Sequence, residues 1–223
     1  PHEREMRKNG RPSIGSGLIF PLSEEKIMID PLYLEDHWPR IAAIDFGWDH
    51  PTAVVWCAMD TEEEMFYVYD CYRASKASPA VHSEVIRGRP HFIPIVYPHD
   101  GNRRDSMGNP GLADQYRNLG CNFLLEHFTN PPALGSNKGS NSVEEGIMAL
   151  LQAMEKGKFK VFSTLGDWFE EFRMYHRKQN KVVPFRDDLM SATRYAFQSQ
   201  RHSVAGKDPT WTQDVEYRNY GII

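Results

Sequence analysis

Two short apolar runs in this 223-residue chain lead directly to an aspartate. Asp45 closes the run at residues 41–44, and Asp100 comes shortly after the run at residues 93–97. Such runs predict buried strands. A third acidic position, the pair Asp187–Asp188, opens a run that predicts a helix, and the helix dipole favours acids in its first turn. Two strand ends and a helix start can therefore meet at one edge of a sheet.

Carboxylates gathered at one sheet edge repel one another unless a cation neutralises them. Hard ions such as Mg²⁺ and Mn²⁺ prefer carboxylate oxygens, and two such ions held together serve phosphodiester hydrolysis. We therefore predict a two-ion site in which the ligands and catalytic residues are Asp45, Asp100, Asp187 and Asp188. Each acid alone also suits an ordinary turn or helix cap. Their shared placement, at two strand ends and the last helix, favours the metal site.

The composition predicts a folded domain, because 40% hydrophobic and 12% aromatic residues suffice for a packed core. The net charge of −4 does not exclude a nucleic-acid binder, since an acidic metal site subtracts charge locally. Cys57, Cys71 and Cys121 are too scattered for a disulfide framework or a zinc site, so we expect core residues in a reducing compartment. No apolar run approaches the roughly 18 residues of a membrane span. Because the chain begins without Met, we expect a piece of a longer polypeptide.

The order of the predicted elements indicates an α/β fold with a mixed five-stranded sheet flanked by helices, as in the ribonuclease H-like fold. The expected elements are a meander of strands at 41–46, 53–59 and 65–71, a helix at 79–87, a strand before Asp100, a helix at 111–119, a strand at 122–125, a strand-like run at 158–162, and helices starting near Ser142, Trp168 and Asp187. We divide the chain into a linker with lead-in strands (1–40, with a short hairpin over 17–29), a ribonuclease H-like nuclease domain (41–200) and a polar tail (201–223).

Basic residues flank the acids, where they are expected to hold a DNA backbone without reading its sequence. Two lie just after Asp100, one lies in the long polar loop at 126–141, and one precedes the last acidic pair. These predicted DNA contacts are Arg103, Arg104, Lys138 and Arg186. His99 adjoins Asp100 and is either an auxiliary group near a metal or phosphate or a partly buried strand-end histidine.

Five segments together carry a resemblance to a known family. They are Ile44-Asp45-Phe46-Gly47, Pro98-His99-Asp100-Gly101, residues 141–147, residues 157–162, and Asp187-Asp188 with Ala192 and Arg194-Tyr195-Ala196. In these the chain resembles the C-terminal nuclease domain of tailed-phage terminase large subunits, especially the headful-packaging type of short-tailed phages. The segment 141–147 is the most specific, because ribonuclease H-like nucleases in general lack it. One departure is Ser191, where many members carry a further Asp.

The resemblance implies a metal-dependent, largely sequence-nonspecific endonuclease acting on concatemeric phage DNA in the host cytoplasm during phage assembly. It implies that Asp45, Asp100 and one or both of Asp187 and Asp188 bind the metal. Its expected partners are double-stranded DNA and, through the C-terminal tail, the terminase small subunit and the portal protein. The family's ATPase motif, Gly-x-x-x-x-Gly-Lys-Ser/Thr, does not occur, so we expect this chain to cut DNA without pumping it.

Three other functions fit parts of the pattern. A Holliday-junction resolvase or transposase would use the same acids on a similar fold, but the segment 141–147 argues against both. A sugar-kinase or actin-like nucleotide binder also opens with Asp-x-Gly after a strand, but it needs a second such loop that this sequence lacks. A non-catalytic docking module would use the aromatic residues of the tail.

Overall fold

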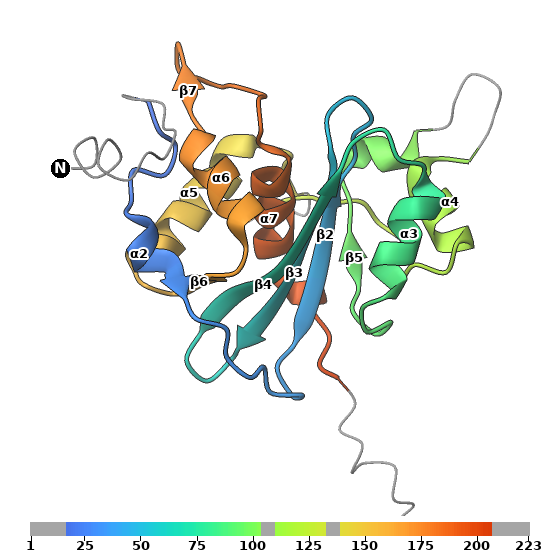
Figure 1. Ribbon diagram of the computed structural model, residues 1–223, viewed down its shortest axis with the longest axis horizontal. Helices are drawn as coiled ribbons and strands as arrows, with labels where there is room; N and C mark the ends of the chain where they lie inside the picture. Colours follow the sequence, from blue (N-terminus) through green and yellow to red (C-terminus); the bar gives the residue numbers. More distant parts are fainter. Residues whose placement is uncertain (1–16, 104–109, 133–138, 207–223) are drawn as a thin grey trace, which may run out of the picture.

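The computed structural model describes residues 17–103, 110–132 and 139–206. Its centre is a mixed six-stranded sheet with the strand order β1-β6-β4-β3-β2-β5 (Figure 1). The strands are β1 (Met28–Ile29), β2 (Arg40–Asp45), β3 (Thr52–Asp60), β4 (Met65–Ala74), β5 (Ile95–Val96) and β6 (Phe159–Phe162). Strands β2, β3 and β4 form the predicted antiparallel meander. Strands β5 and β6 run parallel to their neighbours β2 and β4. The predicted α/β class is confirmed.

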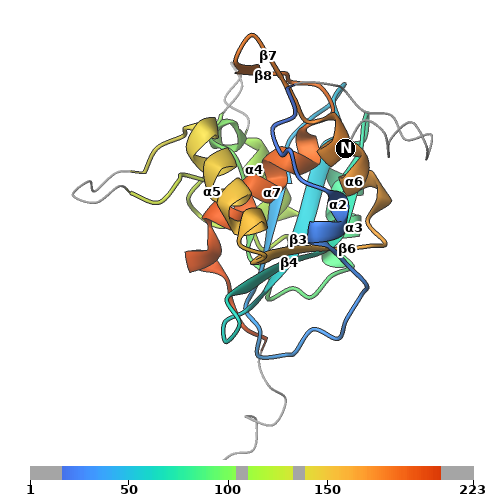
Figure 2. The same ribbon diagram turned by 90° about the vertical axis from the view of Figure 1, so that its left-hand side faces the viewer.

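Helices cover both faces of this sheet. They are α2 (Glu24–Ile27), α3 (Pro79–Arg87), α4 (Leu112–Asn118), α5 (Val143–Glu155), α6 (Gly166–Met174) and α7 (Asp188–Gln198), with short 3₁₀ turns η1 (His99–Asn102) and η2 (Gln200–His202). Helices α5, α6 and α7 lie on one face, and α3 and α4 lie on the other (Figures 1 and 2). A small separate hairpin, β7 (Arg177–Lys178) with β8 (Lys181–Val182), joins α6 to α7. None of the helices in the described ranges is long and apolar enough to cross a membrane.

Strand β3 shows why both faces need a cover. Its side chains alternate between the two faces, and it is buried along nearly its whole length. Val55 and Cys57 belong to the core under α5–α7, whereas Val54 and Trp56 belong to the core under α3 and α4. A strand buried on both faces reads as a continuous apolar run, as this one does. Helix α7 packs directly on β2 and β3, which fixes where its first residues lie.

The strand count and two local predictions are wrong. The sequence predicts five strands, but Met28–Ile29 adds a sixth by pairing in parallel with β6. The predicted hairpin over 17–29 does not form, because Leu18 bridges His176 instead. The predicted strand at 122–125 is reduced to a single bridge between Phe123 and Ile95. Strand β5 is only two residues long, so it cannot support a longer ladder there.

The lead-in segment contributes to the main core. Ile19, Phe20 and Ile27 are all buried in the cluster under α5–α7. Phe20 stacks on Phe172 of α6 with a ring-centroid distance of 5.8 Å. Residues 17–40 thus fold with the rest of the chain, while the domain boundaries at 40 and 200 stay predictions. Residues 207–223, most of the predicted tail, lie outside the described ranges.

Candidate functional site

The ends of β2 and β5 place Asp45 and Asp100 at the same edge of the sheet. The two strands are parallel neighbours, with Ala43 paired with Val96. Asp45 is the last residue of β2, and Asp100 lies in η1, just beyond the end of β5. The carboxyl ends of parallel strands meet at one edge, so the two acids approach each other as the sequence predicts. Asp45 is partly buried, whereas Asp100 is exposed.

Two glycines permit the tight turns that follow these acids. A Cβ on Gly47 would lie 2.3 Å from the carbonyl oxygen of His50, and one on Gly101 would lie 2.6 Å from the ring of Phe46. The hydroxyl of Thr52 also holds the first turn, because it donates to the Gly47 carbonyl at 2.9 Å and accepts from the Gly47 amide at 3.2 Å. The Asp-x-Gly and Asp-Gly patterns are therefore steric requirements of this sheet edge.

Helix α7 brings the acidic pair to the same site. Asp188 is its first residue and is only 8% exposed, and Asp187 occupies the N-cap position. Asp187 nevertheless makes no side-chain capping hydrogen bond. An N-cap aspartate usually spends its carboxylate on the helix amides. The Asp187 side chain therefore does not cap α7, which was one of the roles that the sequence left open for it.

The four carboxylates form one electrostatic cluster. Burial raises the pKa of Asp45 to about 8, and the charges of Asp188, Asp100 and Asp187 add to the rise in that order. Burial, with the neighbouring charge of Asp188, raises the pKa of Asp187 to about 6. Burial also raises the pKa of Asp188. Asp45 is therefore the residue on which the other three converge.

This cluster fits a divalent cation that keeps part of its water shell. Within the described ranges, no three or more His, Cys, Asp or Glu side chains lie close enough together to hold a metal ion. The acids are close enough to raise the pKa of Asp45, yet they form no closed cage. Mg²⁺ is commonly bound by one or two carboxylates while it retains several waters. An open, oxygen-only donor set with mutual repulsion matches that behaviour.

A buried cation behind the acids was not predicted as part of the site. Arg194 of α7 is 5% exposed, and its guanidinium carbon lies 4.6 Å from the ring centre of Tyr195 and 5.6 Å from that of Phe128. Its charge lowers the pKa of both Asp45 and Asp187, against the rise from burial. The Tyr195 hydroxyl donates to Asp45 Oδ1 at 3.5 Å. Arg194 and Tyr195 thus support the acids from inside the fold.

The segment at 141–147 explains how that arginine fits. A Cβ on Gly146 of α5 would lie 2.5 Å from Cγ and Cδ of Arg194, so only glycine leaves room for its side chain. Ser142 caps α5 as predicted, with its hydroxyl accepting from the Glu145 amide at 3.4 Å. The segments around Gly146 and Arg194 are therefore two sides of one contact.

His50 is another residue that the sequence analysis missed, and its charge lowers the pKa of both acids at the start of α7.

The predicted auxiliary histidine and the predicted DNA contacts lie in different surroundings. His99 is exposed beside Asp100, with its ring centre 6.5 Å from that of His127. Arg103 is exposed at the end of η1. Arg186 pairs with Glu170 of α6. Arg104 and Lys138 lie outside the described residues.

Known proteins are similar to this chain in both sequence and structure. A family model described as the Terminase RNaseH-like domain matches residues 42–200. The large terminase subunit of Salmonella phage P22 is 38% identical over 208 residues, which cover 93% of this chain but only 40% of that protein. The solved nuclease domain of the P22 large terminase has a TM-score of 0.77 at 37% identity, covering 86% of this chain and 96% of that one.

A more distant structure has the same fold. The large terminase nuclease of thermophilic phage G20c, solved with bound magnesium, has a TM-score of 0.54 at 16% identity. The match covers 82% of this chain and 98% of that one. The fold is therefore also found in a protein whose sequence has little similarity to this chain.

Proposed function

Because this chain belongs to the terminase RNaseH-like domain family, we propose that it is a metal-dependent endodeoxyribonuclease that cuts concatemeric viral DNA during genome packaging. The observation that carries the proposal is the convergence of three other carboxylates on Asp45 at one sheet edge. Family membership disfavours the resolvase and transposase alternatives. The acid cluster disfavours a module that only docks, because buried like charges are costly without a cation to bind.

The proposed metal ligands divide between the two sides of the cluster. Asp45 would hold metal together with Asp100, from η1 just beyond β5, and with the pair Asp187–Asp188 at the start of α7. Two bound divalent ions would supply a nucleophilic water and stabilise the charge that develops on the phosphate. The G20c nuclease, which was solved with magnesium, supports the choice of ion for this fold.

The chain's own residues hold these ligands and the substrate. Tyr195 orients Asp45 through its hydroxyl, and the charge of Arg194 favours the ionised carboxylate that a cation requires. Four residues are proposed to contact DNA phosphates without sequence preference: Arg103, Arg104, Lys138 and Arg186. His99 is exposed next to Asp100, where it is proposed to assist at the scissile phosphate.

The wider setting is likewise a proposal. The chain spans about 40% of the length of the P22 large terminase subunit. We propose that it acts within a packaging assembly in the host cytoplasm, on double-stranded DNA. The terminase small subunit and the portal protein are the proposed partners of the C-terminal tail.

Incubation with supercoiled plasmid tests the proposal. We expect nicking when millimolar Mg²⁺ or Mn²⁺ is added and none in excess EDTA. Asp45→Asn should abolish nicking because it removes one charge at nearly constant shape. Asp49→Asn is the matched control, since Asp49 is an exposed aspartate in the loop just after Asp45. Undiminished cleavage in EDTA, or by the Asp45 variant, would refute a metal-dependent site here.

A further inference from the structure

Two glutamates of α6 hold the chain on either side of the acidic pair Asp187–Asp188. Glu170 accepts a hydrogen bond from the side chain of Arg186, the residue before the pair. Glu171 accepts one from the backbone amide of Leu189, the residue after it, at 2.6 Å. Helix α6 is thus hydrogen-bonded to the residues on both sides of the acidic pair.

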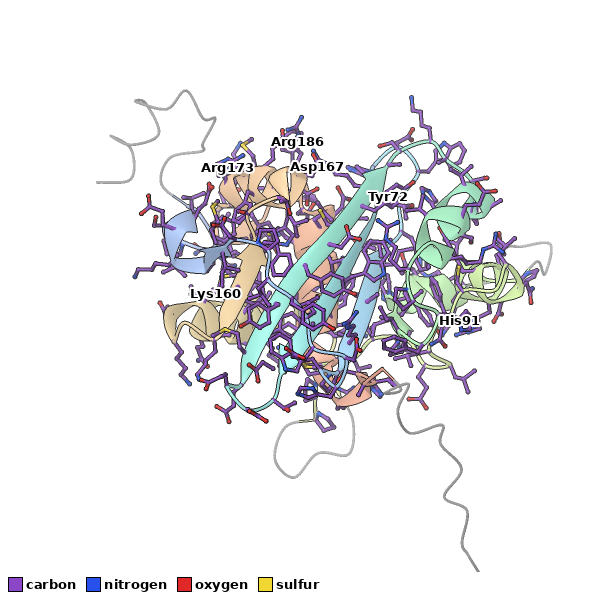
Figure 3. All side chains as sticks on the ribbon, turned by 60° about the horizontal axis from the view of Figure 1, so that its bottom comes forward. Tyr72, His91, Lys160, Asp167, Arg173 and Arg186 are labelled. Carbon is purple, nitrogen blue, oxygen red and sulfur yellow. The ribbon has the colours of Figure 1, made fainter. Side chains whose placement is uncertain are left out.

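A single arginine of the central sheet holds both glutamates. Arg73 of β4 donates through Nη1 to Glu171 at 3.0 Å and through Nη2 to Glu170 at 2.5 Å. Nη2 also donates to Asp167, at 3.1 Å, so three acids of α6 converge on one guanidinium. Arg186 and Asp167 lie at the same end of the molecule (Figure 3). Charge-assisted hydrogen bonds to a planar guanidinium are strong and directional.

The burial of these groups makes the arrangement specific. The Glu171 side chain is fully buried, and that of Arg73 is 19% exposed. Both oxygens of Glu171 are used, one by Arg73 and the other by the Leu189 amide. Removing Arg73 would leave the buried Glu171 carboxyl without its ion pair, which is destabilising.

Glu171 also performs the task that Asp187 would otherwise perform. The first amides of a helix need acceptors, and an N-cap aspartate normally supplies one. Here the amide of Leu189, the second residue of α7, is bound by Glu171 from another helix. The Asp187 carboxylate makes no capping hydrogen bond and is left to the acid cluster.

We propose that Arg73, Glu170 and Glu171 form a clamp that positions the Asp187–Asp188 pair for divalent-metal binding. The inference rests on the proposed metal-dependent function and goes beyond it by naming residues that touch neither metal nor DNA. They act through the Leu189 amide and through the side chain of Arg186. Residues that orient metal ligands typically change metal affinity by about 10–100-fold when they are replaced.

The first test measures Mn²⁺ affinity by titration calorimetry. Arg73→Met should weaken Mn²⁺ binding by about tenfold or more, because the start of α7 loses its anchor. Arg173→Met is a matched control. Arg173, near the end of α6, pairs with Glu24 at 3.0 Å, and its side chain is 18% exposed. This control removes an arginine of similar exposure and an ion pair of the same length as Arg73–Glu171, but that pair holds no residue next to Asp187–Asp188. Its Mn²⁺ affinity should therefore stay within about twofold of wild type.

The second test does not depend on metal. In metal-free protein, NMR should show the Leu189 amide proton shifted downfield and protected from exchange, and Glu171→Gln should reduce both effects. Glu171→Gln keeps the shape of the side chain, so it also replaces Arg73→Met in the calorimetry if that variant does not fold. Mn²⁺ affinity equal to wild type in the variants, or an unchanged Leu189 amide, would overturn the clamp alone. A wild-type chain that binds no Mn²⁺ would overturn the proposed function and the clamp with it.

Discussion

Replacing Asp45 with asparagine should stabilise the metal-free protein. In that protein burial, followed by the charges of Asp188, Asp100 and Asp187, raises the pKa of Asp45 from 3.8 to about 8. At pH 7 the folded chain therefore holds this carboxyl protonated, whereas the unfolded chain ionises it. Folding must take up a proton, so the free energy of unfolding falls as the pH rises from about 4 to about 8.

The size of the effect follows from the two pKa values. Between pH 3.8 and pH 7 lie 3.2 pH units, each equivalent to about 1.4 kcal/mol, which gives an upper bound of about 4.5 kcal/mol. Asparagine has the shape of the carboxyl but needs no proton, so Asp45→Asn removes this penalty. We expect a gain of about 2–4 kcal/mol at pH 7, and a rise in melting temperature of roughly 5 °C or more for a chain of this size.

Urea unfolding in EDTA, at pH 4 and at pH 7, measures this difference. The gain should be large at pH 7 and small at pH 4, because at pH 4 the unfolded chain also holds much of this carboxyl protonated and folding takes up little extra proton. Asp49→Asn, at an exposed position, should show no gain in stability at either pH. Saturating Mg²⁺ should favour the wild type instead, because only its site binds the ion well. An Asp45 variant that is less stable than wild type at pH 7 in EDTA would refute the reasoning.

Three further predictions concern other parts of the molecule. Gly146→Ala should cost about 1–3 kcal/mol in urea unfolding, because its Cβ would meet a buried arginine side chain at 2.5 Å, whereas Gly166→Ala meets nothing within 4 Å and should be near neutral. Asp188→Asn should abolish plasmid nicking, whereas Asp187→Asn should lose only part of the activity and regain some of it with Mn²⁺. The reason is that the charge of Asp188 raises the pKa of Asp45 more than that of Asp187 does. Equal loss of activity in both variants would contradict this. Arg103→Glu should weaken binding to all DNA sequences alike and reduce the salt slope by at least about one, and a loss confined to one sequence would indicate base readout instead.

The sequence predicts the parts of the site that depend on local pattern. Asp45 and Asp100 follow apolar runs, and the start of a helix is marked at Asp187–Asp188, so their meeting follows from sheet geometry. The predicted helix at 79–87 agrees with α3 (Pro79–Arg87), which begins with a proline. The cap at Ser142 is likewise local. Each of these features is set by residues within a few positions of one another.

The remaining features depend on partners that are distant in the chain. Strand β1 is two residues long and exists because β6 pairs with it, so it has no pattern of its own. Arg194 looks like a surface residue of an amphipathic helix until Gly146 is seen to leave room for it. Arg73 and Glu171 are 98 residues apart. An ion pair of that separation cannot be identified from spacing in one sequence.

Anomalous diffraction from crystals soaked with Mn²⁺ tests the central claim most directly. The carboxylates should hold an ion at about 2.1 Å from an oxygen of Asp45, with Asp100 or the start of α7 as a further ligand. A two-ion site should show a second peak about 3.5–4 Å from the first, and both should vanish in Asp45→Asn. Manganese bound only elsewhere, with no peak at Asp45 in protein that cleaves plasmid, would contradict the account.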